Sequence, residues 1–145
     1  MASWTPLGAR TQDARADPPV HYPGLLGLQV LVVEDEPMVA MLLEDMLADF
    51  GCVLAGTAAT VNEALSTIGK GADIDAAILD VNLGGMKIFP VADLLAARSV
   101  PFVFSTGFDP ADLTERYPDS RLLHKPYQPE ALAKVLADFA HGPPI

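Results

Sequence analysis

The chain has 145 residues, 50% of them hydrophobic, and a formal net charge of −10. This length suffices for one hydrophobic core but not for two ordinary domains. The acidic balance disfavours direct nucleic-acid binding, and no apolar run approaches the roughly 20 residues that cross a bilayer, so we expect neither a nucleic-acid nor a membrane partner.

Residues 1–27 are predicted to form a flexible extension in front of one folded domain, residues 28–145. The extension contains four prolines and three glycines and shows no sustained period of 2 or 3.6 residues. A second interpretation stays open, in which its apolar side chains dock on the domain or on a partner. These side chains are Trp4, Leu7, Tyr22 and the Leu25-Leu26 pair.

The domain has the pattern of an α/β fold, because short apolar runs alternate with amphipathic stretches from Leu28 onward. This alternation is typical of parallel strands joined by crossover helices in a doubly wound sheet. Five strands are predicted, at residues 28–33, 52–58, 76–81, 101–105 and 121–124. Four helices are predicted, at residues 37–50, 61–68, 90–98 and 129–141. Residues 111–117, between two prolines, leave room for one more helix that is short or mobile.

Local signals mark the ends of these helices. Pro37 occupies a favoured first position of the first helix, and Gly51 follows its last residue. Thr60 and Glu63 have the spacing of a capping box in front of the second helix. The methionines of the first helix are predicted to fill the core: Met38, Met41 and Met46.

Polar side chains follow four of the five predicted strands at their carboxyl ends, where open parallel sheets carry their functional crevice. The groups are Glu34-Asp35-Glu36, Asp80, Ser105-Thr106-Gly107 and His124-Lys125-Pro126. Each group alone is more often an ordinary surface acid, a turn or a surface lysine. Four such groups at one edge of a sheet favour a functional site instead.

The residue types at this edge indicate phosphoryl transfer with magnesium. Carboxylates gathered together repel one another unless a cation joins them, and oxygen ligands without Cys or His favour Mg²⁺ over zinc. Because Mg²⁺ usually shares its site with phosphate oxygens, Asp80 is the expected nucleophile. Thr106 and Lys125 are expected to stabilise charge on the transferred oxygens.

Other candidates carry weaker signals. Gly84-Gly85 lacks the following lysine and hydroxyl of a phosphate-binding loop and is predicted to be a tight turn. Cys52, on an apolar strand, is predicted to be an inert core residue. A single cysteine and the lack of a secretory signal in the first residues make the cytoplasm the expected compartment.

The motifs at the strand ends are Val32-Val33-Glu34-Asp35-Glu36-Pro37, Asp80-Val81-Asn82, Thr106-Gly107 and Lys125-Pro126. In order and spacing they resemble the motifs of response-regulator receiver domains, over residues 28–141. The resemblance implies a five-stranded flavodoxin-like receiver fold in which Mg²⁺ is bound by Glu34, Asp35, Asp80 and the Asn82 backbone carbonyl. It also implies that Asp80 is phosphorylated, that Thr106 and Lys125 hold the phosphoryl group, and that the Lys125-Pro126 bond is cis.

The resemblance further implies a partner and a mode of action. A histidine kinase or phosphotransfer protein would donate the phosphoryl group. The domain, as a stand-alone receiver without an output domain, would then signal by binding an unknown downstream protein, or act as a phosphate sink. It would be no metabolic enzyme and would catalyse only its own slow phosphorylation and dephosphorylation.

Two stretches, Asp80-Val81-Asn82-Leu83-Gly84-Gly85 and residues 101–108, together resemble an alphaproteobacterial subgroup named for a Phe-Ala-Thr-Gly-Tyr strand motif. Residues 101–108 read Pro-Phe-Val-Phe-Ser-Thr-Gly-Phe, with serine in place of the alanine and phenylalanine in place of the tyrosine. Leu122 stands where chemotaxis-type receivers carry a switch aromatic. We therefore expect phosphorylation to act through Thr106 and a change of order over residues 107–118.

Two rival classes stay open. A pseudo-receiver would keep the fold and act only as an interaction module, which the complete acidic set with Thr106 and Lys125 disfavours. A small phosphatase or flavin protein could use a similar sheet. However, Glu34-Asp35-Glu36 would repel a flavin phosphate, and no Asp-x-Asp arrangement ends the first strand.

Overall fold

Five apolar segments pair into one parallel sheet in the computed structural model, which describes residues 23–107, 116–118 and 120–141. The strands are β1 (Gln29–Val33), β2 (Val53–Ala58), β3 (Ala76–Asp80), β6 (Phe102–Thr106) and β7 (Arg121–His124). Their order in the sheet is β2-β1-β3-β6-β7, and every neighbouring pair is parallel. This arrangement confirms the predicted doubly wound α/β fold of flavodoxin-like type.

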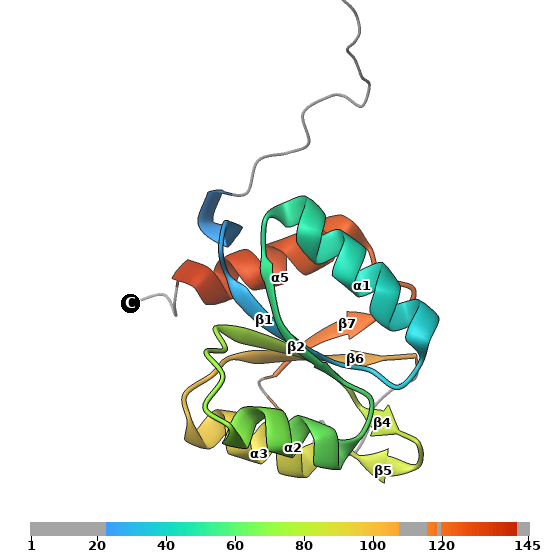
Figure 1. Ribbon diagram of the computed structural model, residues 1–145. Coiled ribbons are helices and arrows are strands. Elements are labelled where there is room, and N and C mark those ends of the chain that lie inside the picture. The colour runs from blue at the N-terminus through green and yellow to red at the C-terminus, as the bar shows by residue number, and fades with distance from the viewer. Residues whose placement is uncertain (1–22, 108–115, 119, 142–145) are drawn as a thin grey trace, which may run out of the picture.

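Helices cover both faces of the sheet (Figure 1). One face carries α1 (Pro37–Phe50) and α5 (Pro129–His141), and the other carries α2 (Val61–Gly69) and α3 (Phe89–Ala97). Side chains along a strand alternate between the two layers, so Val30 and Val32 pack toward α1 and α5 while Leu31 and Val33 pack toward α2 and α3. The central strands β1 and β3 are therefore apolar on both faces, as a doubly covered parallel sheet requires.

The predicted helix signals act where they were expected. Pro37 opens α1 and Gly51 ends it. In front of α2, the Thr60 hydroxyl accepts the Glu63 N–H at 3.0 Å, and the Glu63 carboxylate accepts the Ala59 N–H at 2.8 Å. The Glu63 side chain thus reaches one residue further back than in the usual capping box.

The prediction that the α1 methionines fill the core is wrong for two of the three. Met38 is 82% exposed and Met41 is 61% exposed, whereas Met46 packs against the core. The stripe that packs inward follows a spacing of three and four residues and consists of Val39, Leu43, Met46, Leu47 and Phe50. Met38 and Met41 lie outside this stripe, and their side chains meet solvent.

A small hairpin follows β3 that the sequence patterns did not predict as strands. It consists of β4 (Asn82–Leu83) and β5 (Met86–Lys87), which pair antiparallel and lie at the end of the sheet toward which β6 and β7 point (Figure 1). Gly84 and Gly85 both have positive φ, at 53° and 87°, as a two-residue hairpin turn of type I′ requires. This confirms the predicted tight turn.

The segment before β1 packs on the domain. A short 3₁₀ helix, η1 (Pro23–Leu25), leads into β1, and Leu25 is fully buried among residues of α1 and α5. The next residue, Leu26, is 71% exposed, and the Gly27 N–H donates to the Gly51 carbonyl at 2.8 Å. Docking on the domain is therefore observed for Leu25, while residues 1–22 lie outside the described residues.

Two further expectations concern a helix before β7 and the absence of a membrane-spanning segment. The expected helix at residues 111–117 falls largely outside the described residues, so it stays a prediction. Within the described ranges, no helix is both long and apolar enough to span a bilayer.

Candidate functional site

Three acidic side chains meet at the carboxyl ends of the adjacent strands β1 and β3. Glu34 and Asp35 follow β1 directly, and Asp80 is the last residue of β3. Each contributes one carboxylate oxygen to a group in which all three atoms lie within 4.8 Å of one another. Glu34 and Asp80 are buried and Asp35 is half-buried. Carboxylates this close and this buried require a positive partner. These three residues are called the acidic cluster below.

Lys125 supplies that positive partner. Its Nζ lies 3.0 Å from Glu34 Oε1 and 3.2 Å from Asp80 Oδ2. Burial by itself would lower the pKa of Lys125. The Glu34 hydrogen bond and the charges of Asp80 and Glu34 outweigh this effect and raise the pKa well above its ordinary value, so the side chain stays charged.

The backbone around Lys125 ties it to the end of β6. Its N–H donates to the Thr106 carbonyl at 3.0 Å. The Lys125-Pro126 bond is cis, as the motif resemblance implied. The ammonium group therefore reaches the acidic cluster from a chain segment that is itself fixed to the neighbouring strand.

Backbone N–H groups orient two of the carboxylates. The Glu36 N–H donates to Glu34 Oε2 at 3.1 Å, and the Gly84 N–H donates to Asp35 Oδ2 at 3.1 Å. The second bond links the hairpin turn to the end of β1. Asn82, the expected source of a carbonyl ligand, lies in β4 and pairs with Lys87.

Thr106 lies at the same edge of the sheet because of the strand register. It is the last residue of β6 and is buried, and it pairs with His124 of β7. Its neighbour Ser105 pairs with Asp80 of β3. The structure thus brings four predicted residues into direct proximity, Glu34, Asp35, Asp80 and Lys125, and sets Thr106 beside them on the adjoining strand end.

One residue of the site was missed by the sequence patterns. Tyr127 is buried, its hydroxyl hydrogen-bonds with the Ser105 hydroxyl, and it donates to Glu34 Oε1 at 3.4 Å. Burial raises the pKa of Tyr127 to about 12, against the lowering effect of the Ser105 hydrogen bond and with the Glu34 charge adding to the rise. The only sequence signal was an aromatic residue two positions after Lys125, in a loop without any periodic pattern.

Cys52 lies apart from these residues, just before β2, and is half-buried against the core. Burial raises the pKa of its thiol to about 11, so the thiol is protonated near neutral pH. This agrees with the predicted inert role, although Cys52 precedes the strand rather than lying within it.

The donor atoms of the acidic cluster fit a magnesium ion. They are carboxylate oxygens, which hard divalent cations prefer, and the described part of the cluster contains neither Cys nor His. Three oxygen ligands also leave positions for water and for a phosphate oxygen, which is the usual composition of a Mg²⁺ site in phosphoryl transfer.

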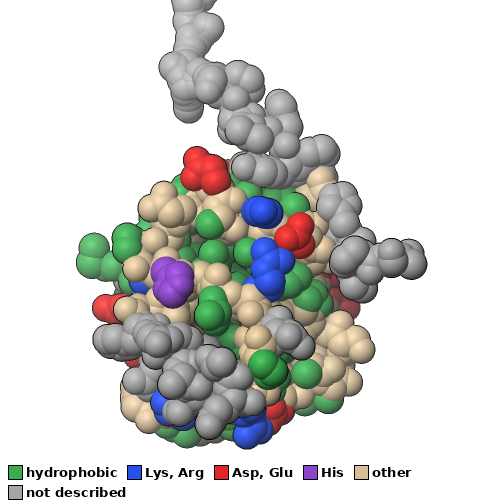
Figure 2. All heavy atoms as spheres, turned by 180° about the vertical axis from the view of Figure 1, so that it is seen from behind, with side chains coloured by type: hydrophobic (Ala, Val, Ile, Leu, Met, Phe, Trp, Pro, Cys, Tyr) green, Lys and Arg blue, Asp and Glu red, His purple; other side chains and the backbone are tan. Residues whose placement is uncertain are grey.

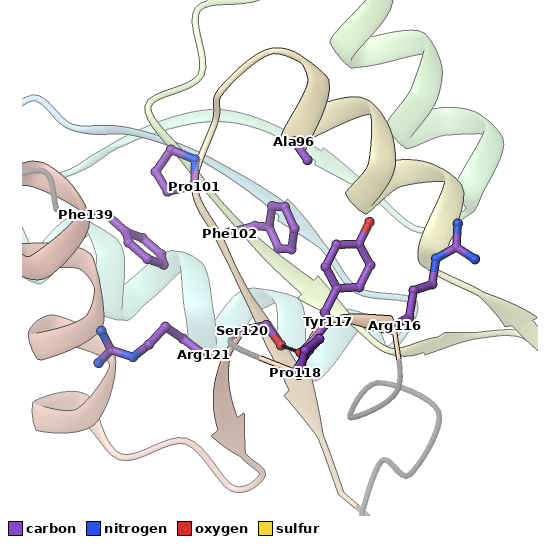
Figure 3. Close-up of a pocket in the computed structure, with 9 residues that line it drawn as sticks. All are labelled: Ala96, Pro101, Phe102, Arg116, Tyr117, Pro118, Ser120, Arg121 and Phe139. Atoms are coloured by element: carbon purple, nitrogen blue, oxygen red, sulfur yellow. Dashed lines mark hydrogen bonds between the residues drawn. The ribbon is translucent and has the colours of Figure 1, made fainter.

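A separate cavity of about 410 Å³ lies at the amino ends of β6 and β7 (Figure 3). Aromatic and apolar side chains, including Phe102, Tyr117 and Phe139, form much of its wall. Its two arginines are already paired: Arg116 lies 2.5 Å from Asp93, and Arg121 lies 2.8 Å from Asp138. No residue of the acidic cluster lines this cavity, which is therefore distinct from the site.

The surface seen in Figure 2 carries its charges in scattered positions. Two basic side chains lie close together in the upper centre of this view with an acidic one beside them, and other basic side chains lie near its lower edge. The described part of this face thus offers no continuous basic surface of the kind that follows a phosphate backbone.

Comparisons with known proteins agree on one family. The sequence model of the response regulator receiver domain family matches residues 30–137 of the chain. The phyllosphere-induced regulator PhyR of Methylorubrum extorquens is 30% identical over 115 residues, which cover 77% of this chain and 43% of that protein. The chain thus spans less than half the length of this relative.

Solved structures of similar length give a closer match. The solution structure of SdrG from Sphingomonas melonis Fr1 is 46% identical with a TM-score of 0.69, and the match covers 81% of this chain and 98% of that one. The BeF3-activated conformation of SdrG from Pseudomonas melonis Fr1 is 48% identical with a TM-score of 0.66, covering 77% and 95%.

Proposed function

The chain belongs to the response regulator receiver domain family, and from that premise we propose that it is a phospho-acceptor, phosphorylated on Asp80 by a histidine kinase or phosphotransfer protein. The observation that carries the proposal is the junction of three carboxylates and one lysine at the carboxyl end of the sheet. Cytoplasm is the proposed compartment, because Cys52 is a free thiol that a reducing environment preserves.

Glu34, Asp35, Asp80 and the backbone carbonyl of Asn82 are the proposed Mg²⁺ ligands. When bound, the ion would offset the charge of the carboxylates and of the incoming phosphate oxygens. The fit of the acidic cluster to an oxygen-ligated cation supports this assignment.

The proposed reaction is a transfer between two side chains. A carboxylate oxygen of Asp80 attacks the phosphorus of a phosphohistidine on the donor, the new O–P bond forms, and the P–N bond breaks with its electron pair returning to the imidazole. Water later attacks the acyl phosphate, which releases inorganic phosphate and restores the Asp80 carboxylate.

Lys125 and Thr106 would hold the transferred group. Lys125 already lies 3.2 Å from Asp80, so its ammonium group can pass from the carboxylates to the phosphoryl oxygens with little movement. The Thr106 hydroxyl, buried at the neighbouring strand end, would donate a hydrogen bond to the same group. The expected change of order over residues 107–118, of which 108–115 lie outside the described residues, would then carry the signal to a downstream protein, unless the chain acts as a phosphate sink.

Beryllofluoride with Mg²⁺, a mimic of the aspartyl phosphate, tests the proposal. That a BeF3-activated form exists for the similar protein SdrG supports this choice of probe. Amide spectra of the wild type should shift around Glu34, Asp80, Thr106 and Lys125 when both are added, whereas Asp80→Asn should not respond to the mimic. Asp49→Asn, which removes an exposed carboxylate from α1, should respond like the wild type.

Two results would count against the phospho-acceptor role. A wild type that ignores both Mg²⁺ and the mimic would leave the pseudo-receiver, an interaction module only, as the better description. A response that survives in Asp80→Asn would move the acceptor to another residue.

A further inference from the structure

Two buried hydroxyl groups adjoin the acidic cluster and have no part in the proposed phosphoryl transfer. Ser105 lies within β6 and is fully buried, and Tyr127 follows the cis proline Pro126 and is 6% exposed. Their hydroxyls hydrogen-bond to each other, and the Tyr127 hydroxyl also donates to Glu34 Oε1 at 3.4 Å. The contact joins β6, the loop after β7 and the end of β1.

The number of available protons indicates which group donates in each of the hydrogen bonds that join Ser105, Tyr127 and Glu34. A tyrosine hydroxyl has one proton to donate, and an ionised carboxylate can only accept, so the Tyr127 proton points to Glu34. Of the two directions that the Ser105–Tyr127 contact allows, we therefore infer the one in which the Ser105 hydroxyl donates to the Tyr127 oxygen. A hydroxyl that accepts a hydrogen bond becomes a better donor, so Ser105 strengthens the bond that Tyr127 makes to Glu34.

Glu34 has few other contacts that fix its orientation. Its Oε2 accepts the Glu36 N–H, and its Oε1 is shared between Tyr127 and Lys125. In the proposed reaction Lys125 turns to the phosphoryl group. Of the two side chains that contact Glu34 Oε1 among the described residues, Tyr127 then remains. A buried carboxylate without such a hold could rotate away from the metal position.

We propose that Tyr127, and Ser105 acting through it, are positioning residues for Glu34 that keep its carboxylate oriented for Mg²⁺. This inference rests on the proposed magnesium site. Ser105 stands in place of the alanine of the similar strand motif. The Ser105 hydroxyl is therefore a feature of this sequence and not of the motif. It also means that an alanine at position 105 should be accommodated.

The test compares Tyr127→Phe, Ser105→Ala, the double variant and a matched control. Tyr117→Phe is the control because its hydroxyl donates to Asp93 on α3 rather than to the acidic cluster. Two quantities are measured on the full chain: the Mg²⁺ dissociation constant, from amide shifts during titration, and the ¹³C shift of the Glu34 side-chain carboxyl without metal. Thermal melts verify that each variant is folded.

Tyr127→Phe should weaken Mg²⁺ binding by about tenfold, the lower end of what loss of a ligand-orienting contact typically causes. Ser105→Ala should weaken it less, and the double variant should match Tyr127→Phe, since the serine acts only through the tyrosine. The Glu34 carboxyl shift should move in both single variants. Tyr117→Phe should match the wild type in both measurements.

The outcomes separate this inference from the proposed function. A wild type that binds Mg²⁺, with equal dissociation constants and an unmoved Glu34 shift in Tyr127→Phe and Ser105→Ala, would overturn the inference alone. Losses that add in the double variant would overturn the indirect role of Ser105. If the wild type fails to bind Mg²⁺, the proposed function fails, and the metal-free Glu34 shift still decides whether the hydroxyls hold this carboxylate.

Discussion

Lys125 would have two roles that it cannot fill at the same time. In the structure it is the counter-charge of Glu34 and Asp80. In the proposed reaction it must release these carboxylates and bind the phosphoryl oxygens. A divalent cation would compete with it for the same oxygens, because two positive groups cannot share them without mutual repulsion. In the proposed function Lys125 would therefore oppose magnesium binding and assist phosphorylation.

Replacement of Lys125 by methionine, which keeps the apolar stem, should separate these effects. We expect Mg²⁺ affinity to rise by about tenfold, which corresponds to the loss of about 1.4 kcal/mol of net repulsion between the two positive groups. Without Mg²⁺ the free energy of unfolding should fall by about 3 kcal/mol, the lower end of the usual cost when buried carboxylates lose their partner. Calorimetric titration and urea unfolding measure the two quantities.

Lys134→Met provides the matched control for this change. Lys134 is an exposed lysine of α5, so its loss alters the net charge equally without touching the acidic cluster. Unchanged or weaker Mg²⁺ binding in Lys125→Met, relative to this control, would show that Lys125 does not compete with the ion.

Single residues also mark the limit of what the sequence could reveal about the site. Glu34, Asp80, Thr106 and Lys125 could be proposed because each lies at or just beyond the end of a predicted strand, and parallel strands end at one edge. Tyr127 and Ser105 could not be linked in this way. Their contact depends on the path of the loop after β7, for which local pattern carries no information.

Among the elements, α1 shows how periodicity can mislead. Its apolar residues cover more of the helix circumference than the core can receive, so the sequence alone could not tell the buried part from the rest. The structure leaves Met38, Met41 and Leu42 exposed on the helix that begins directly after the acidic cluster. Exposed apolar groups beside the proposed site of phosphoryl transfer suit contact with the proposed donor protein.

Alanine at both Met38 and Met41 should therefore slow phosphorylation by a protein donor by about tenfold, as loss of central apolar contacts commonly does. Phosphorylation by a small donor such as acetyl phosphate should be unchanged, because the acidic cluster is intact. Stability should also stay within about 0.5 kcal/mol, since both side chains are exposed. Radiolabel transfer from each donor gives the comparison.

Leu54→Ala, an exposed leucine on the edge strand β2, controls for the loss of surface apolar area. It should leave both reactions as they are. An equal loss with the protein donor and with acetyl phosphate in the α1 variant would point to damage at the acidic cluster instead of a lost contact.

The five strands of the main sheet were predicted as closely as the four helices. All five begin and end within one residue of the predicted bounds, because short apolar runs between polar turns leave little choice of position. The β4–β5 hairpin was not predicted, since strands of two residues are too short to show alternation. Only its turn, Gly84-Gly85, carried a recognisable signal.

At the scale of the whole molecule, the folded unit includes part of the segment in front of β1. Leu25 fills space among residues of α1 and α5, and the adjacent Leu26 faces solvent. Composition could not distinguish these neighbours, because a proline-rich and glycine-rich stretch gives no period from which burial can be deduced. Substitution of the buried leucine can therefore be compared with substitution of its exposed neighbour.

Leu25→Ala should lower the free energy of unfolding by about 2 to 4 kcal/mol, the usual cost of a large buried side chain truncated to alanine. Leu26→Ala should change it by less than about 0.5 kcal/mol. Urea unfolding of both variants measures the difference. Similar values for the two would mean that η1 contributes nothing to the core in solution.

The sheet order has a consequence for synthesis of the chain. The acidic cluster comes from β1 and β3, whereas its positive partner follows β7, which comes after the other four strands of the described sheet along the chain. A nascent chain interrupted before residue 121 would hold Glu34, Asp35 and Asp80 without Lys125, and without the α5 side chains that cover one face of the sheet. On the proposed function, translation would therefore have to pass Lys125 before the chain could hold a phosphoryl group, so products that stop earlier would neither draw phosphate from the donor nor compete with longer products for it.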